Sequence, residues 1–293
     1  MLHRVAKAFG ILAAPATYVI GRLIGSDTFA AKSIQLDSHY LRGYSTLMES
    51  KRVESETFYR LTQAARICAS ANRSIDTEML NWLPKAHGQL LQDVVLLLLR
   101  NSKRGGYFVE VGVGDGTKYS NSLMLERDFA WRGILVEPAR VFYDTIAASR
   151  TAILDRRAIS DRTGDTLAFE QDDKTGELSG LAGKRTPRGT QILSTYDVKT
   201  VRFDELLEEY SAPDEIDYVS IDTEGSELSV LSGLSLTRRR IHFLTIEHNY
   251  DAERKRRYNE ILFGAGYVEI LPHLSGFDAW YVHKDSSRGL FSE

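Results

Sequence analysis

Two short acidic turns hold the residues best suited to chemistry. Residues 222–225 (Asp-Thr-Glu-Gly) follow one apolar segment, and residues 247–249 (Glu-His-Asn) follow another. An imidazole accepts a proton near neutral pH, so His248 is our first candidate for a side chain that takes up a proton. Asp222 or Glu224 could orient His248 or accept the proton instead. The structural alternative is a histidine that is bonded to a nearby backbone carbonyl.

The same two turns offer hard oxygen ligands. Asp222 and Glu247 provide carboxylates and Asn249 provides an amide oxygen, which are ligand types that Mg²⁺ or Ca²⁺ prefers in proteins. A divalent ion held there could bind hydroxyl groups and lower their pKa. The sequence therefore leaves both metal-free and Mg²⁺-dependent chemistry open.

A third element that could bind a ligand is the segment 107–116. Its apolar first half, which contains the acid Glu110, predicts a short buried strand, and three glycines follow at alternating positions, Gly112, Gly114 and Gly116. Strand, glycine turn and helix is how a parallel sheet brings backbone close to a nucleotide-like ligand. Glycine suits the turn because a Cβ would block both the tight bend and the close approach.

The glycine spacing separates two classes of cofactor. A dinucleotide fingerprint requires G-x-G-x-x-G, but Thr117 stands where its third glycine would be. An NAD(P)-dependent oxidoreductase is therefore disfavoured. The observed G-x-G-x-G, preceded by an acid, resembles motif I of the S-adenosylmethionine (SAM) methyltransferases. That cofactor carries no phosphate and needs acceptors for an amino group as well as backbone contacts.

A second predicted strand and a third would complete such a pocket. Residues 133–136 predict the second strand, and Glu137 at its tip could accept hydrogen bonds from both ribose hydroxyls of an adenosyl group or could cap a helix. Residues 153–159 predict the third strand, where Ala158 and Ile159 could cover an adenine face.

The acidic turns lie at the ends of the next two predicted strands. Residues 216–221 predict the fourth strand and residues 242–246 the fifth. In an open parallel sheet the first and fourth strands flank the switch point, so their carboxyl ends should meet at one crevice. Residues 267–271 and 279–282 predict a closing antiparallel pair. The glycine-containing loop 176–189 could be an excursion over the site or a disordered tip.

Composition fits one α/β domain with an N-terminal extension. The chain has 293 residues, 43% of them hydrophobic, and a net charge of −3, so it can bury a full core and has no overall drive toward nucleic acid. We expect no nucleic-acid partner. The lone Cys68 excludes an internal disulfide and fits a reducing compartment, which favours a cytoplasmic location, and its helical spacing predicts a buried thiol.

We predict a helical extension over residues 1–85 and a catalytic domain over residues 86–293. Apolar residues recur at helical spacing over 54–70 and 89–100, whereas the polar stretch 72–87 predicts a bend or loop.

The start of the chain admits three interpretations. The uncharged stretch 8–21 is shorter than the roughly 20 apolar residues that a membrane span requires. It could be a helix packed on the domain, an interfacial anchor that gives peripheral membrane contact, or an artefact of the choice of start site. We prefer the packed helix.

The ordered motifs together resemble one family. VEVGVGDG (109–116), GILVEP (133–138), DYVSIDTEGSE (217–227) and LTIEHNY (244–250) look like an FkbM-type methyltransferase, and the match covers roughly residues 89–282. The resemblance implies an α/β, Rossmann-like class I methyltransferase with a seven-stranded, mostly parallel sheet and a C-terminal antiparallel hairpin. It also implies SAM as cofactor.

The resemblance assigns roles by position. The residues that it carries over to cofactor binding are Glu110, Gly112, Gly114, Asp115, Gly116, Asn121 and Glu137. Family members usually methylate hydroxyls of sugars or natural products, so we expect an O-methyltransferase that acts on a sugar, glycan or glycosylated natural product. An alcohol reacts only as its proton leaves, which gives His248, Asp222 or Glu224 the role of base.

Two alternatives to that function remain. One is a metal-dependent small-molecule O-methyltransferase, similar to the catechol-type enzymes, with Mg²⁺ held by Asp222, Glu247 and Asn249. The other is a non-catalytic SAM-binding protein. The acceptor and the oligomeric state are left open.

Overall fold

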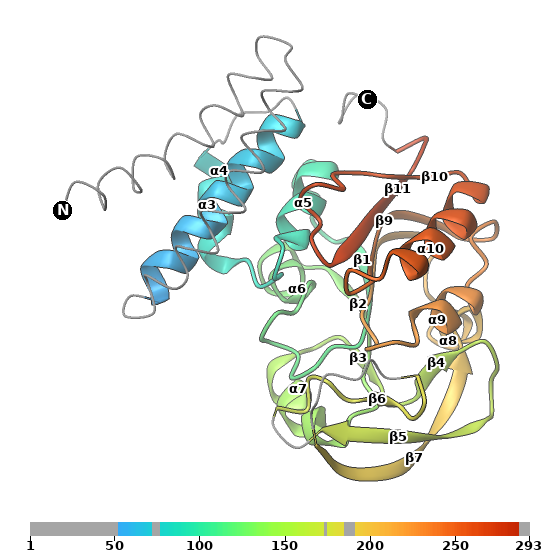
Figure 1. Cartoon of the computed structure of the whole chain (residues 1–293). Helices are drawn as coiled ribbons and strands as arrows, with labels where there is room; N and C mark the ends of the chain where they lie inside the picture. The colour runs from blue at the N-terminus through green and yellow to red at the C-terminus, as the bar shows by residue number, and fades with distance from the viewer. Residues whose placement is uncertain (1–51, 72–76, 173–174, 185–190, 287–293) are drawn as a thin grey trace. The chain divides into compact units, whose positions relative to one another are not determined.

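The computed structural model describes residues 52–71, 77–172, 175–184 and 191–286 (Figure 1). The chain divides into two units, residues 1–85 with 289–293, and residues 86–288. The stretch 8–21 lies outside the described residues, so its three interpretations stay predictions. No helix in the described ranges is long and apolar enough to cross a membrane.

In the first unit, helix α3 (Arg52–Ser70) is followed by α4 (Thr77–Trp82) and the 3-10 helix η1 (Leu83–Lys85). The prediction of a loop over 72–87 is therefore wrong in its second half. Met79, Trp82 and Leu83 are buried, and their i, i+3, i+4 spacing is that of an amphipathic helical turn. Cys68 is buried, as predicted.

The second unit is built on a seven-stranded sheet with the order β10-β11-β9-β8-β1-β2-β3. The five strands β3, β2, β1, β8 and β9 are parallel to one another, whereas β11 is antiparallel to both β9 and β10. The bounds are β1 Tyr107–Val111, β2 Arg132–Val136, β3 Ile153–Asp155, β8 Glu215–Ile221, β9 Arg240–Glu247, β10 Tyr267–Glu269 and β11 Asp278–His283. The predicted α/β, Rossmann-like sheet with its closing antiparallel hairpin is confirmed.

Helices cover both faces of this sheet (Figure 1). They are α5 (Gln92–Leu99), α6 (Leu123–Phe129), η2 (Arg140–Phe142), α7 (Tyr143–Ser149), α8 (Phe203–Glu209), α9 (Glu227–Ser232) and α10 (Ala252–Gly264). Leu206, Val230 and Leu262 of α8, α9 and α10 share one core cluster with Val109 and Val219 of the sheet. Burial of both faces explains the near-continuous apolar runs in the parallel strands.

The predicted third strand is in fact two strands. Residues 153–155 form β3 and pair with β2, whereas β4 (Ala158–Ser160) pairs with β7 (Ile192–Arg202) in a second sheet. The chain bends between them because the Asp155 carboxylate accepts a hydrogen bond from the Arg157 backbone N–H at 2.8 Å, a local turn that competes with a continuous ladder. The second sheet has the order β4-β7-β5-β6, with β5 at Thr166–Asp172 and β6 at Gly180–Leu181.

The tips of β1 and β8 approach each other closely. The Asp222 N–H donates to the Val111 carbonyl at 2.9 Å, and the Gly112 N–H donates to the Val136 carbonyl at 2.9 Å. Gly112 has a φ of +81°, and a Cβ on it would lie 1.5 Å from the Asp222 carbonyl oxygen. The chain's own backbone therefore requires glycine at this position.

Replacing Gly112 with Ala should destabilise the protein by about 3 kcal/mol or more, because the added carbon forces β1 and β8 apart and the φ is unfavourable for alanine. Gly264 is the matched control, since an added Cβ there meets nothing within 4 Å and its φ is not in the left-handed region. Gly264→Ala should leave stability unchanged or raise it by up to about 1 kcal/mol. Urea unfolding compares the two variants, and equal stability would contradict the close approach.

Candidate active site

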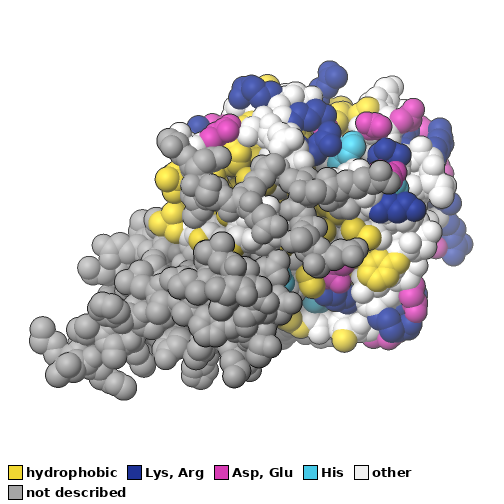
Figure 2. All heavy atoms as spheres, turned by 90° about the horizontal axis from the view of Figure 1, so that it is seen from above, with side chains coloured by type: hydrophobic (Ala, Val, Ile, Leu, Met, Phe, Trp, Pro, Cys, Tyr) yellow, Lys and Arg dark blue, Asp and Glu magenta, His cyan; other side chains and the backbone are white. Residues whose placement is uncertain are grey.

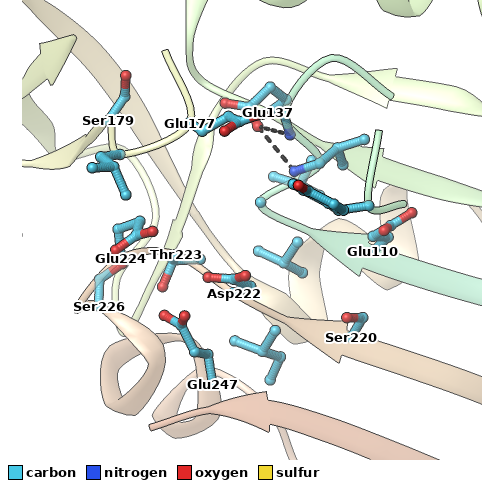
Figure 3. A pocket seen from close by; sticks show the side chains of 18 of the residues that line it. Glu110, Glu137, Glu177, Ser179, Ser220, Asp222, Thr223, Glu224, Ser226 and Glu247 are labelled. Carbon is cyan, nitrogen blue, oxygen red and sulfur yellow. Dashed lines mark hydrogen bonds between the residues drawn. The ribbon is translucent and has the colours of Figure 1, made fainter. Parts of the chain in front are cut away.

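A cavity of about 330 Å³ lies at the carboxyl ends of β1, β2, β8 and β9 (Figure 3). Its volume is in the range of small-molecule sites. All but two of the predicted site residues line it, namely Glu110, Gly112, Gly114, Asp115, Asn121, Glu137, Ala158, Ile159, Asp222, Glu224, Glu247 and Asn249. The exceptions are Gly116 and His248. The sheet thus brings together residues that lie up to 139 positions apart in the chain (249 − 110).

Gly116 has a supporting position rather than a lining one. Its N–H donates to the Val113 carbonyl at 3.2 Å, which closes the turn. A Cβ on Gly116 would lie 3.1 Å from Ile146 of α7. The third glycine therefore lets the turn pack against a helix.

His248 is not among the residues that line the cavity. It is 5% exposed, and its Nε2 lies 3.0 Å from the Asp278 carbonyl oxygen, to which the ring N–H can donate. Burial, with a smaller effect of Lys255, lowers the pKa of His248 below its ordinary value. The structure therefore places His248 in the arrangement of the structural alternative, bonded to a backbone carbonyl.

Glu137 organises the glycine turn. Its Oε2 accepts hydrogen bonds from the Val113 N–H at 2.9 Å and the Gly114 N–H at 2.8 Å, and its Oε1 accepts from the Ala139 N–H at 2.8 Å (Figure 3). Burial raises the pKa of Glu137 to about 7, against the opposing effect of the three N–H donors. A Cβ on Gly114 would meet nothing within 4 Å, so this side of the turn is open to a ligand.

Glu110 shapes the loop that precedes α6. Its carboxylate accepts hydrogen bonds from the Ser120 hydroxyl at 3.0 Å, the Asn121 N–H at 2.7 Å and the Ser122 hydroxyl at 2.5 Å. The Asn121 side-chain amide donates to the Ser220 hydroxyl at 3.0 Å, and its Oδ1 accepts no hydrogen bond from the described residues. An acceptor of this kind at the cavity wall suits an ammonium or amide donor.

Asp115 and the pair Ala158 and Ile159 also line the cavity, in different ways. Asp115 Oδ1 accepts from the Thr117 and Lys118 N–H groups, each at 2.7 Å, and so caps the turn. Ala158 and Ile159 are buried in β4. They contribute apolar surface to the cavity, as an adenine contact would require.

Three carboxylates converge at the tips of β8 and β9. Oxygens of Asp222, Glu227 and Glu247 lie within 4.8 Å of one another, and Figure 3 shows Asp222 and Glu247 pointing toward each other. Burial, followed by the negative charge of Glu247, raises the pKa of Asp222 well above its ordinary value. A shared proton or a cation would each relieve this repulsion.

The third member of this cluster is not the ligand that we predicted from the sequence. Asn249 donates a side-chain hydrogen bond to Glu247, so its amide nitrogen faces the carboxylate. Glu227 takes the third position instead, while its Oε1 also accepts from the Thr223 and Gly225 N–H groups at 3.1 and 2.7 Å. Glu227 is not among the ligands that we predicted from the sequence, because its spacing of five residues from Asp222 carries no recognisable signal.

The second sheet adds a wall that the motifs did not predict. Gly176, Glu177, Leu178, Ser179 and Leu181 line the cavity, so the described part of the loop 176–189 is an excursion over the site. Lys118 joins this wall to the glycine turn, with its Nζ 2.7 Å from a Glu177 oxygen.

Two arginine-rich segments, residues 238–240 and 254–257, form ion pairs with acidic side chains. Arg238 pairs with Glu208, and Arg256 pairs with Glu253 and Glu260. On the face seen in Figure 2, Lys and Arg side chains lie among Asp and Glu side chains. The expectation of no nucleic-acid partner stays a prediction.

Comparison with known proteins identifies the family of this chain and a relative of low sequence identity. Residues 110–274 match the model described as the methyltransferase FkbM domain. The hexuronic acid methyltransferase AglP of Haloferax volcanii is 27% identical over 162 residues, which are 53% of this chain and 61% of that protein. The chain thus spans less than two thirds of that relative's length.

Likeness to solved structures is low. A precorrin-6y C5,15-methyltransferase from Geobacter metallireducens GS-15 aligns with a TM-score of 0.36 and 13% identity, over 62% of this chain and 73% of that one. The CurJ carbon methyltransferase aligns with a TM-score of 0.33 and 11% identity, over 96% and 92%. At such scores the likeness carries no argument, and the strand order above defines the fold.

Replacing Glu137 with Gln should change how stability depends on pH. Because burial raises the pKa of Glu137 from 4.5 to about 7, its contribution to stability is complete below pH 4.5 and is lost as the pH rises through 7. The free energy of unfolding of the wild type should therefore fall by up to about 3 kcal/mol, relative to that of Glu137→Gln, between about pH 5 and about pH 8. Thermal unfolding of both cofactor-free proteins measures this. If the difference in stability between the two proteins did not vary with pH, the raised pKa of Glu137 would be contradicted.

Proposed function

Because the chain belongs to the FkbM methyltransferase family, we propose that it transfers the methyl group of SAM to a hydroxyl of a sugar, glycan or glycosylated natural product. Membership in the family makes it a methyltransferase enzyme and implies SAM as its cofactor. The relative AglP is described as a hexuronic acid methyltransferase, which supports a sugar acceptor.

The residues of the cavity suit this cofactor. Glu137 lies at the tip of β2, where its Oε2 already accepts two N–H groups and its Oε1 accepts one, so Oε1 keeps one acceptor site for a ribose hydroxyl. Ala158 and Ile159 supply an apolar surface for adenine. Asn121 Oδ1 provides an acceptor for an amino group. When bound, SAM supplies an electrophilic methyl group on a positively charged sulfur, and the carboxylates of the lining favour that charge.

One observation carries the proposal of hydroxyl methylation, namely the position and raised pKa of Asp222. Its side chain is partly accessible in the cavity, and its proton affinity is increased by burial and by Glu247. A raised pKa makes the ionised carboxylate a stronger proton acceptor. Asp222 can therefore take the proton of an acceptor hydroxyl, whereas the Nε2 of His248 is bonded to a carbonyl.

The remaining contribution is alignment. Methyl transfer requires the acceptor oxygen, the methyl carbon and the sulfur in one line, and holding them so is worth about 7–11 kcal/mol in a well-oriented site. Asn249 donates a hydrogen bond to Glu247, and the Glu247 carboxylate lies beside that of Asp222 at the neighbouring strand tip. Glu224 lines the same part of the cavity and is the second candidate for the base.

A cytoplasmic location is a further proposal. A single cysteine in the whole chain, Cys68, fits a reducing compartment. Fractionation of cells would test it, together with peripheral membrane contact through the N-terminus.

Asp222→Asn should lower kcat about 10²–10⁴-fold, because the amide cannot accept the hydroxyl proton. Binding of S-adenosylhomocysteine, measured by calorimetry, should change only a few-fold. The matched control is Glu208→Gln on the surface of α8, outside the cavity, which should behave as wild type. If turnover were lost in His248→Ala but kept in Asp222→Asn, the base would be the imidazole.

A second candidate, Mg²⁺-dependent methylation, is favoured by the convergence of Asp222, Glu227 and Glu247. The donor set is all oxygen, as Mg²⁺ prefers. We expect the base mechanism, so activity should be fully retained after dialysis against EDTA. Loss of activity in EDTA, restored by Mg²⁺ and abolished in Glu227→Gln, would favour the metal instead.

A further inference from the structure

The aromatic ring of Tyr250 is unusually exposed for a residue in a cavity wall. It is 74% exposed, and no large apolar side chain in the described ranges is more so. Tyr250 nevertheless lines the cavity and stands three residues after Glu247, the last residue of β9. Proposed catalysis at Asp222 does not use this ring, so its exposure needs another explanation.

The exposed ring is held in place rather than loose. Asn249 and Tyr250 have φ values of +52° and +61°, a left-handed conformation that is sparse for residues other than glycine and is kept only where surrounding contacts enforce it. The His248 and Asn249 N–H groups both donate to the Phe277 carbonyl, at 2.8 and 3.0 Å. This pair of hydrogen bonds fixes the turn that presents Tyr250.

Two rings pack against Tyr250 edge-on. Its centroid lies 6.3 Å from that of His248 and 6.5 Å from that of Phe277, with interplanar angles of 87° and 77°. Edge-to-face contacts of this kind favour one ring orientation. The Nε2 of His248 is itself anchored to the Asp278 carbonyl, so His248 has the role of a positioning residue for Tyr250.

An exposed aromatic face beside carboxylates is suited to a sugar ring. The ring face can pack against the C–H groups of the sugar, and carboxylate oxygens can accept hydrogen bonds from its hydroxyls. Asp222, Glu224 and Glu247 line the same cavity as Tyr250. The combination therefore recognises a polyhydroxylated ring better than an apolar acceptor.

The charge of the lining restricts which sugar can bind. Its acidic residues are Glu110, Asp115, Glu137, Glu177, Asp222, Glu224, Glu247 and Asp278. Among the described lining residues the basic side chain is Lys118, and this one pairs with Glu177 at 2.7 Å. The positively charged sulfonium of SAM is favoured in such a cavity. A carboxylate on the acceptor would add to the negative charge that already raises the pKa of Asp222.

We propose that Tyr250 and the neighbouring carboxylates form the acceptor subsite, and that this subsite selects an uncharged sugar ring over a uronate. The inference rests on the proposed function. It gives this chain an acceptor of different charge from the hexuronic acid named for AglP, even though the two proteins share sequence similarity.

Matched pairs of methyl glycosides test the charge selection. Methyl glucoside and methyl galactoside are compared with the corresponding uronates, which differ only by a carboxylate in place of the C6 hydroxymethyl group. SAM turnover should favour each neutral sugar by about tenfold or more in kcat/KM, since like charges a few ångströms apart repel strongly at low ionic strength. Added salt should reduce this difference by raising the kcat/KM of the uronate, because screening weakens the repulsion between its carboxylate and the acidic lining.

Substitution of Tyr250 tests the subsite itself. Tyr250→Ala should raise the KM for the neutral glycoside about tenfold, as truncation of a contacting aromatic residue typically does, and should leave binding of S-adenosylhomocysteine unchanged. Tyr250→Phe keeps the ring and should restore most of the affinity. Phe263→Ala is the control, since Phe263 is an aromatic residue that is 49% exposed on α10 and outside the cavity lining.

The outcomes separate this inference from the function on which it rests. Equal or better use of the uronates, or an unchanged KM in Tyr250→Ala, would overturn the subsite while leaving a sugar methyltransferase. Transfer to none of the glycosides would instead overturn the sugar acceptor, and with it the subsite. Unaltered binding of S-adenosylhomocysteine by Tyr250→Ala shows that the variant is folded.

Discussion

The contact between the tips of β1 and β8 is the constraint on which the site depends. Gly112 passes so close to the Asp222 carbonyl that no side chain fits, and the Asp222 N–H is bonded to Val111. This contact places the glycine turn and the acidic turn at one edge of the sheet, which is the switch point of an open parallel sheet. The first glycine of the motif is therefore explained by strand packing, and Gly114 leaves the space that a cofactor can occupy.

Much of the fold could be predicted because both sheet faces are buried. The parallel strands read as apolar runs, so β1, β2, β8 and β9 were located within a few residues. The break between β3 and β4 was missed, since the local turn in which Asp155 accepts a hydrogen bond from the Arg157 N–H interrupts a stretch that we predicted as one continuous strand. The helix α4 was missed because polar residues surround its short apolar stripe.

The site could be predicted where residues follow strand ends, and less well where they meet through tertiary contacts. Glu137 and Asp222 stand at strand tips, and the topology brings them to one cavity. Glu227 and the wall from Gly176 to Leu181 reach it through a turn and a second sheet. His248 has the residue type of a base, but β11 supplies the Asp278 carbonyl that engages its ring, and this pairing is invisible in sequence.

The packing of His248 also accounts for its place beside the acidic tip. Two of its neighbours in sequence, Glu247 and Asn249, line the cavity, whereas the His248 ring is turned into the protein. Because the ring is tied to β11 and packs edge-on against Tyr250, the segment 247–250 presents the Glu247 carboxylate and the Tyr250 ring to the same cavity. The proposed base, Asp222, stands at the tip of β8, and Glu247 lies beside it. The two strand ends together therefore hold the proposed base and the proposed acceptor-binding ring in the fixed relation that in-line methyl transfer requires.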